Sequence, residues 1–261
     1  MNFVDTHCHL YDEAFDGDRL EAIQRALQAG VGTMLLPDID RSSTPALDRL
    51  VSECPGHFFP MAGLHPTSVD GDYEAGLEHV RARLLSPPQG VKFVAVGEIG
   101  MDLYWDTTFR EQQRDALRRQ LLWAIEAGLP VCLHIRKAMN EVFGLLRDVG
   151  RPSYSGVMHC FGGSLQEAAR AVEMGFMLGI GGVVTFKGST MAEVAKSMPL
   201  ESLLLETDAP YLTPAPHRGK RNESSYIPVI AQRVADLRGI SLQQVAEVTT
   251  ANARRLFRLG E

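Results

Sequence analysis

The chain has 261 residues, of which 45% are hydrophobic and 22% are charged, and it contains 24 glycines and 14 prolines. This composition excludes a disordered chain, a collagen and a disulfide-rich mini-protein, and the length allows a core that needs no disulfide or metal to stabilise it. Lysine and arginine number 26 against 32 aspartates and glutamates, and the resulting net charge of −6 argues against a protein that coats nucleic acid by charge alone.

Short apolar runs rich in β-branched residues recur along the chain, and each is short enough to be a buried parallel strand. They span residues 3–4, 33–36, 58–64, 91–96, 131–135, 156–159, 176–180 and 203–205. Amphipathic stretches lie between them, including 19–29 and the longest, 109–127. Regular alternation of strand and helix predicts an α/β fold with a parallel sheet and helices outside it.

Helix starts are marked by capping boxes, in which Ser or Thr precedes Glu or Gln by three residues. These pairs are Thr108 with Glu111, Ser164 with Glu167, and Ser241 with Gln244. A long loop is expected over 213–225, followed by helices over 228–237 and from Ser241 onwards. Eight strand–helix units fit one domain, residues 1–261, folded as a (β/α)8 TIM barrel. An open, doubly wound sheet is the alternative, because periodicity does not report closure.

The chain has the features of a cytoplasmic protein. No apolar run approaches the roughly 18 residues of a membrane span, and the N-terminus lacks the basic and apolar segments of a secretory signal. The four cysteines, which have no close pair spacing, are typical of reduced thiols: Cys8, Cys54, Cys132 and Cys160. We therefore expect no membrane association, and no feature indicates an obligate protein partner.

The first chemical signal is the run Asp-Thr-His-Cys-His at residues 5–9. Side chains alternate along a strand, so Asp5, His7 and His9 are expected on one face. Two imidazoles at this spacing can bind one divalent ion. On its own, the pair is equally consistent with two ordinary histidines.

Ionisable residues also end other predicted strands. Three are histidines and two are acids: His65, His134, His159, Glu98 and Asp208. In a barrel the C-terminal ends of all strands meet at one mouth, where active sites of this fold lie. Converging ionisable groups are costly to bury unless they hold a metal or perform chemistry. The pattern therefore predicts a metal site at the mouth.

The candidate ligands are too many for one ion. There are six, namely His7, His9, Glu98, His134, His159 and Asp208. Around one small ion they would leave no room for substrate, whereas two ions about 3.5–4 Å apart, sharing a carboxylate, would suit them. Asp5 is a candidate to orient ligands from behind. Imidazole-rich sites suit Zn, Mn, Fe or Ni better than Mg.

Six motifs, in family order, resemble those of the TatD family of metal-dependent hydrolases, within the amidohydrolase-like superfamily. They are Asp-Thr-His-Cys-His-Leu, Gly-Leu-His-Pro, Gly-Glu-Ile-Gly-Met-Asp, Leu-His-Ile-Arg, His-Cys-Phe-Gly-Gly-Ser and Glu-Thr-Asp-Ala-Pro-Tyr-Leu-Thr-Pro. The resemblance extends from Asp5 to about Asn252. It implies a TIM barrel with a two-metal centre and, for some members, deoxyribonuclease activity, typically 3′–5′ exonuclease, usually with Mg.

The resemblance also implies a role for each ligand. His7 and His9 resemble ligands of one metal, and Glu98 resembles the bridge between the two metals. The second metal is then held by His134 and His159. Asp208 resembles a ligand beside the first metal, and it is placed to take a proton from the attacking water as general base. The expected cofactors are two divalent cations, Mg, Mn or Zn, and the expected catalytic residues are Glu98 and Asp208.

Basic side chains near the predicted mouth suit a phosphate-bearing substrate such as DNA or an oligonucleotide. The expected substrate contacts are His65, Arg136, Arg218, Lys220 and Arg221. Tyr104 and Trp105 follow Glu98 closely, where they either stack on a base or pack on a neighbouring loop. The family usually has an acid where Lys137 stands, so the substrate is less firmly implied than the metals.

Three functions are compatible with these residues. The first is a phosphodiesterase acting on DNA ends or short oligonucleotides by water activated at two metals. The second is an amide or ester hydrolase of a small or aminoacylated molecule, because the same chemistry attacks carbonyl carbon. The third is a barrel that binds a ligand without turnover, against which the complete ligand set argues.

Overall fold

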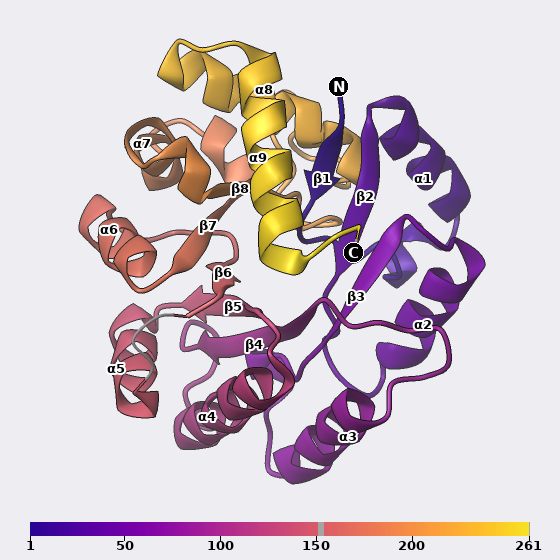
Figure 1. Cartoon of the computed structure of the whole chain (residues 1–261), viewed down its shortest axis with the longest axis vertical. Coiled ribbons are helices and arrows are strands. Elements are labelled where there is room, and N and C mark those ends of the chain that lie inside the picture. Colours follow the sequence, from indigo (N-terminus) through magenta and orange to yellow (C-terminus); the bar gives the residue numbers. More distant parts are fainter. Residues whose placement is uncertain (151–153, 261) are drawn as a thin grey trace.

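The computed structural model describes residues 1–150 and 154–260, and its centre is an eight-stranded parallel sheet in which each strand pairs with the next along the chain (Figure 1). The strands are β1 (Phe3–Asp5), β2 (Val31–Leu36), β3 (Phe58–Ala62), β4 (Ala95–Asp102), β5 (Val131–Arg136), β6 (Gly156–Met158), β7 (Phe176–Ile180) and β8 (Leu203–Leu205). The sequence prediction of a parallel α/β sheet is confirmed.

The first and last strands are joined just beyond their ends. The backbone N–H and the hydroxyl of Thr6 both donate to the carbonyl of Leu205, at 3.0 and 3.1 Å. Cys8 and Ala209 form a parallel bridge one step further on. These contacts close the sheet on itself, so the (β/α)8 TIM barrel is confirmed over the open sheet.

Helices surround the barrel and alternate with its strands (Figure 1). They are α1 (Arg19–Gln28), α2 (Thr44–Glu53), α3 (Tyr73–Leu85), α4 (Arg110–Ala127), α5 (Met139–Val149), α6 (Leu165–Glu173), α7 (Thr190–Ser197), α8 (Ile227–Arg238) and α9 (Leu242–Phe257). Short 3-10 turns add η1 (Glu13–Phe15), η2 (Pro66–Ser68), η3 (Gly182–Thr185), η4 (Leu200–Ser202) and η5 (Ser224–Tyr226).

Two of the three predicted capping boxes are present. Ser164 and Ser241 cap α6 and α9, each with its reciprocal partner three residues on. The predicted box at Thr108 is wrong, because α4 has Phe109 at its N-cap position and no side-chain cap. The Thr108 N–H instead donates to the Asp106 carboxylate at 2.8 Å, in a turn that precedes the helix.

The fourth strand lies further along the chain than predicted, and it contains a bulge. The expected span was 91–96, whereas β4 runs from Ala95 to Asp102. Pairing of β4 with β5 shifts by one residue between Val96 and Ile99, a region that includes Glu98. A Cβ at Gly97 would lie 2.6 Å from that of Cys132, so glycine is required for this close approach. Bulges redirect side chains near active sites, and this one places Glu98.

The part of the barrel interior opposite the C-terminal mouth is packed with apolar side chains. Most strands contribute one: Val4, Leu35, Met61, Ala95, Cys132, Val157 and Leu204. Ala253 and Phe257, from the last two turns of α9, join this cluster from below, and Figure 1 shows α9 crossing the end of the barrel. The ionisable residues of the candidate site lie beyond this cluster, at the opposite, C-terminal mouth. None of the described helices has the length and apolar character needed to cross a membrane.

Candidate metal centre

The six candidate ligands meet at the C-terminal mouth of the barrel. They come from β4 and β5 and from the residues just after β1, β6 and β8: Glu98, His134, His7, His9, His159 and Asp208. Glu98 is at their centre and only 2% exposed. Asp5, which was predicted to orient ligands from behind, is fully buried at the end of β1. Its carboxylate accepts hydrogen bonds from the N–H of His7 and Thr207.

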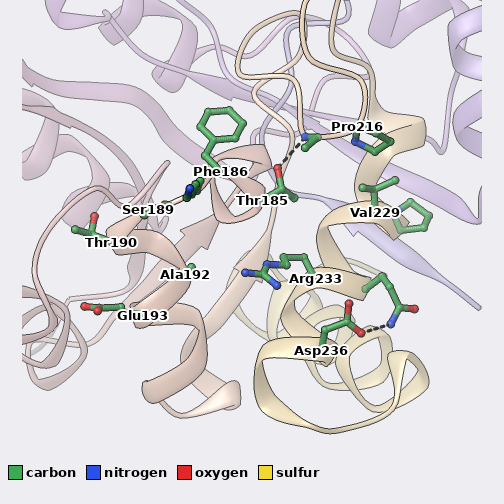
Figure 2. Close-up of a pocket in the computed structure, with 15 residues that line it drawn as sticks. Thr185, Phe186, Ser189, Thr190, Ala192, Glu193, Pro216, Val229, Arg233 and Asp236 are labelled. Atoms are coloured by element: carbon green, nitrogen blue, oxygen red, sulfur yellow. Dashed lines mark hydrogen bonds between the residues drawn. The ribbon is translucent and has the colours of Figure 1, made fainter.

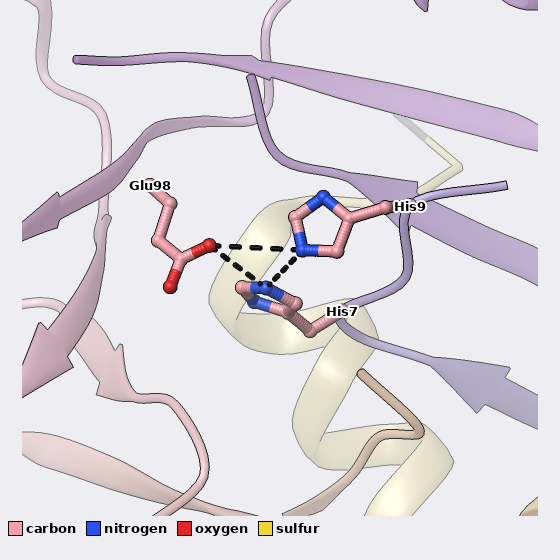
Figure 3. Close-up of side chains that lie close together, drawn as sticks. All are labelled: His7, His9 and Glu98. Atoms are coloured by element: carbon pink, nitrogen blue, oxygen red, sulfur yellow. Dashed lines mark hydrogen bonds and ion pairs between the residues drawn. The ribbon is translucent and has the colours of Figure 1, made fainter. Parts of the chain in front are cut away.

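The two carboxylate oxygens of Glu98 face two different sets of donors. Oε2 lies 3.1 Å from His7 Nε2 and 3.8 Å from His9 Nε2 (Figure 3). Asp208 Oδ1 lies 3.6 and 3.5 Å from the same two nitrogens. We call His7, His9 and Asp208 the first donor group.

The second donor group consists of His134 and His159. Glu98 Oε1 lies 2.9 Å from His134 Nδ1 and 3.7 Å from His159 Nε2. A carboxylate with one oxygen toward each donor group has the arrangement of a bridging ligand between two ions.

The first donor group has the spacing that one divalent ion requires. Ligands bound tetrahedrally at about 2.0–2.2 Å lie roughly 3.3–3.6 Å from one another. The nitrogens of His7 and His9 are 3.2 Å apart, and their distances to the Glu98 and Asp208 oxygens are 3.1–3.8 Å. The residues present therefore fit a metal at this position.

The first donor group is oriented by hydrogen bonds on its far side. His9 Nδ1 lies 2.9 Å from the hydroxyl oxygen of Tyr11, which donates its single proton to the carbonyl of Pro37 at 2.6 Å. His9 Nδ1 must therefore carry the proton in this contact, which leaves the lone pair on Nε2, toward Glu98.

Two acids that the sequence analysis did not single out orient the second donor group. Asp102 Oδ2 lies 2.9 Å from His134 Nε2, and Glu206 Oε1 lies 3.0 Å from His159 Nδ1. The contact of Asp102 is a hydrogen bond, and such an acceptor holds a ligating imidazole in one tautomer and raises its basicity. The contact of Glu206 is an ion pair, in which His159 Nδ1 makes no hydrogen bond. Glu206 is fully buried, and a Cβ at Gly179 would overlap its carboxylate, so this glycine makes its place. Their nearness in sequence to Glu98 and Asp208 was the available signal.

His65 also reaches the centre, but its ring proton lies on Nε2, whereas that of His9 lies on Nδ1. Its Nδ1 accepts the backbone N–H of Thr67 at 3.1 Å, and the Thr67 hydroxyl is 2.6 Å away. A nitrogen that accepts an N–H carries no proton, so the proton of the neutral ring is on Nε2, 3.4 Å from Glu98 Oε1. His65 with Glu98 and His134 has metal-binding spacing, yet its hydrogen bonds to Thr67 leave a proton, and not a lone pair, directed toward Glu98.

Charge within the centre is balanced between carboxylates and imidazoles. Burial alone would raise the pKa of Glu98, but the imidazoles of His7, His65 and His159 outweigh burial and hold that pKa well below its ordinary value. Burial opposes charge on His159 as well, yet Glu206, Asp208 and Glu98 together raise its pKa to about 10. The pKa of His134 rises to about 9 against burial, through its bonds to Asp102 and Glu98.

These raised pKa values predict that metal binding releases protons. Without metal, His134 stays protonated up to about pH 9 and His159 up to about pH 10. Their protonation stabilises the folded metal-free protein in full below pH 6.5. This stabilisation is lost as the pH rises through the two raised pKa values. A metal needs the neutral rings, so its affinity should rise with pH across the same interval. Calorimetric titration of metal-free protein in buffers of different ionisation enthalpy should count about two protons released at pH 7.5. A pH-independent affinity would contradict this charge balance.

The basic residues expected to bind substrate lie around the rim, in different surroundings. Arg136 stands two residues beyond His134 on β5, with its guanidinium 3.9 Å from the centre of the Tyr104 ring. Arg218 lies 4.0 Å from the Phe186 ring, and Lys220 is exposed. Arg221 forms a two-fold ion pair with Asp18, at 2.6 and 2.8 Å, so its charge is already neutralised.

A separate groove of about 1140 Å³ lies beside the mouth, between η3–α7 and α8 (Figure 2). Its walls are mainly apolar or uncharged and include Phe186, Pro216 and Val229, with Arg233 and Asp236 at one end. None of the six candidate ligands lines it. The clustered ionisable groups, and not this volume, therefore mark the candidate site.

Comparison with known proteins relates the whole chain to one family. The family described as TatD related DNase matches residues 4–258. The chain is 38% identical over 257 residues to the uncharacterized metal-dependent hydrolase YabD of Bacillus subtilis, covering 98% of this chain and 99% of that protein. It is 35% identical over 263 residues to a protein of Pantoea vagans named 3′-5′ ssDNA/RNA exonuclease TatD, covering 98% and 99%.

Solved structures of TatD proteins have the same fold as this chain. The crystal structure of YjjV, a TatD homologue from Escherichia coli K12, superposes with a TM-score of 0.90 at 35% identity, over 98% of each chain. A TatD family hydrolase from Entamoeba histolytica gives a TM-score of 0.83 over 98% of each chain at 22% identity, a likeness of fold.

Proposed function

The chain belongs to the TatD family of metal-dependent hydrolases, and we propose that it is a phosphodiesterase that removes nucleotides from the 3′ end of DNA or a related strand. The observation that carries the proposal is the central carboxylate of Glu98, whose two oxygens face two donor groups. Two-metal centres of this form serve in-line displacement at phosphorus. A relative named as a 3′-5′ ssDNA/RNA exonuclease supports the choice of substrate and polarity.

The residues of the mouth divide the work of such a reaction. Two divalent cations, Mg, Mn or Zn, would be held by the two donor groups with Glu98 between them, and they would supply Lewis acidity and an acidified water. Asp208, partly exposed at the edge of the first donor group, accepts the proton of the attacking water as general base. Asp102 and Tyr11 keep the lone pairs of His134 and His9 directed inward, and Glu206 forms an ion pair with His159.

His65 is proposed to donate its Nε2 proton to a phosphoryl oxygen as charge develops there. His65→Ala should then lower kcat by roughly 10²–10³-fold, the usual effect of losing one such donor, while both metals remain bound. His65→Gln, which keeps a donor at a similar reach, should recover part of the rate. Metal analysis and turnover of the two variants check this, and loss of metal in parallel with activity would show that His65 is a ligand.

Three cations of the rim are proposed to contact substrate phosphates: Arg136, Arg218 and Lys220. Arg221 was also expected to contact substrate, but its ion pair with Asp18 favours an indirect role. In that role it holds the loop that carries Arg218 and Lys220. Replacing Arg218 and Lys220 together by methionine should raise KM for a DNA strand and reduce its dependence on salt by about two phosphate contacts. An unchanged salt slope would remove this loop from the substrate site.

The proposed compartment is the cytoplasm, with which four free thiols agree. The proposed activity is tested with metal-defined protein on single-stranded DNA carrying a label at either end, a simple phosphodiester, and a panel of amides and esters, each with Mg, Mn or Zn. Stepwise shortening from the 3′ end, abolished by chelator, would support the exonuclease. Turnover of an amide or ester alone would keep the metal centre and transfer the function to the second alternative, whereas no turnover of any substrate would favour a binding barrel.

A further inference from the structure

Two large aromatic side chains stand exposed at the rim, directly after the strand that carries Glu98. Tyr104 is 51% exposed and Trp105 is 72% exposed. Their ring centres are 4.8 Å apart, and the rings are nearly perpendicular at 89°. The Tyr104 N–H donates to the Asp102 carboxylate at 2.9 Å, so this pair is tied to the residue that orients His134.

Arg136 lies against both rings. Its guanidinium carbon is 3.9 Å from the centre of the Tyr104 ring and 5.0 Å from that of Trp105. Side chains alternate along β5, so Arg136 is on the same side of the strand as His134, one step nearer to solvent. Across the described part of the chain, Arg136 forms no ion pair with a carboxylate, although from a longer distance its charge adds to the effect of His134 in lowering the pKa of Asp102. Its N–H donors therefore remain available to a ligand at the mouth.

The other tryptophan of the chain shows what a packing role looks like. Trp123 on α4 is partly buried against the cluster around Leu77 and is flanked by Arg81 and Arg119, both of which also pair with acids. Trp105 has no such cover. A largely exposed indole beside a guanidinium that forms no ion pair matches the two parts of a nucleotide, a planar base and an anionic phosphate.

We infer that Trp105, Tyr104 and Arg136 form a nucleotide subsite at the rim beside the second donor group. The indole of Trp105 stacks on an unpaired base, Arg136 binds the phosphate of the same nucleotide, and Tyr104 holds both in place. The inference rests on the proposed function and deepens it, because it specifies a strand whose bases are free to stack. A base inside a duplex offers no face to the indole.

Binding tests the subsite without hydrolysis. The chain has two tryptophans, so Trp123→Phe in the Asp208→Asn protein leaves Trp105 as the sole indole. A short oligothymidylate should quench its fluorescence to saturation, and Trp105→Ala in the Asp208→Asn background should weaken binding roughly 5- to 150-fold, as expected for one lost base stack. Leu85→Ala is the matched control, since Leu85 is 67% exposed at the far end of α3. Equal binding by the Trp105→Ala and parent proteins would overturn the subsite.

A strand lacking a base decides between stacking and indirect effects. Oligothymidylates with one abasic residue, moved along the 3′ end, should bind the parent protein more weakly at one position, and at that position Trp105→Ala should have no further effect. Equal losses for intact and abasic strands would mean that Trp105 acts without touching a base, which contradicts the inference. If strands bind through Trp105 but protein with Asp208 intact does not cleave them, the proposed phosphodiesterase fails and the subsite stands. If strands are cleaved and neither binding nor cleavage depends on Trp105, the subsite fails and the proposed phosphodiesterase stands.

Discussion

Glu98→Gln is expected to lower turnover by on the order of 10³-fold or more, and to reduce metal content in the same protein. The amide keeps the shape of the carboxylate but has only one acceptor atom, so it cannot face both donor groups as Oε1 and Oε2 do. It also removes the negative charge that the surrounding imidazoles stabilise. Metal analysis after dialysis, together with turnover on the best substrate, measures both effects.

The control for this variant is Glu53→Gln, the same chemical change at an exposed position at the end of α2. It should leave both metal content and rate at their wild-type values. A Glu98→Gln protein with full activity would show that the two donor groups do not share a bridging carboxylate. A protein that keeps its metals but loses its rate would assign Glu98 to the reaction more than to the metals.

Asp208→Asn is expected to lower kcat by roughly 10²–10⁴-fold, the usual contribution of a general base. Asparagine keeps an oxygen toward His7 and His9 but cannot accept a proton at neutral pH. Most of the metal should therefore remain, because His7, His9 and Glu98 still surround the first position. The measurement is kcat against pH with metal content determined for the same samples.

The result separates the two roles proposed for Asp208. Loss of rate with metals retained supports the base, whereas parallel loss of both indicates a ligand only. Asp236→Asn, an exposed position at the far end of the neighbouring groove, is the matched control and should change neither quantity. Wild-type rate in the Asp208→Asn protein would require another base.

Most of the barrel could be predicted because its signals are local. Seven of the short apolar runs overlap strands at nearly the expected positions, and the capping boxes at Ser164 and Ser241 are real. The exception was β4, where residues 95–102 include two glycines that resemble a turn in sequence. Glycine is required in this strand because the neighbouring strand lies so close, as Gly97 does to Cys132. A contact between two strands leaves no pattern in the local sequence.

The membership of the site followed from the fold, because every strand of a barrel ends at the same mouth. The geometry of the site could not be predicted from the fold. The tautomers depend on partners distant in sequence, such as Asp102 for His134, and the ion pair of Arg221 with Asp18 joins a late loop to an early one. Asp208 and Cys160 adopt left-handed φ angles of 59° and 44°, which non-glycine residues rarely do and which composition does not reveal.

The bond between Thr6 and the carbonyl of Leu205 spans 199 positions of the sequence. Because the seam beside it carries His7 and His9 on one side and Asp208 on the other, the first donor group is assembled from the earliest and the latest parts of the barrel. During translation, a ribosome-bound chain that has exposed only the first seven strands has no complete set of ligands. The first metal position is therefore complete only once the eighth strand has emerged and the seam has formed.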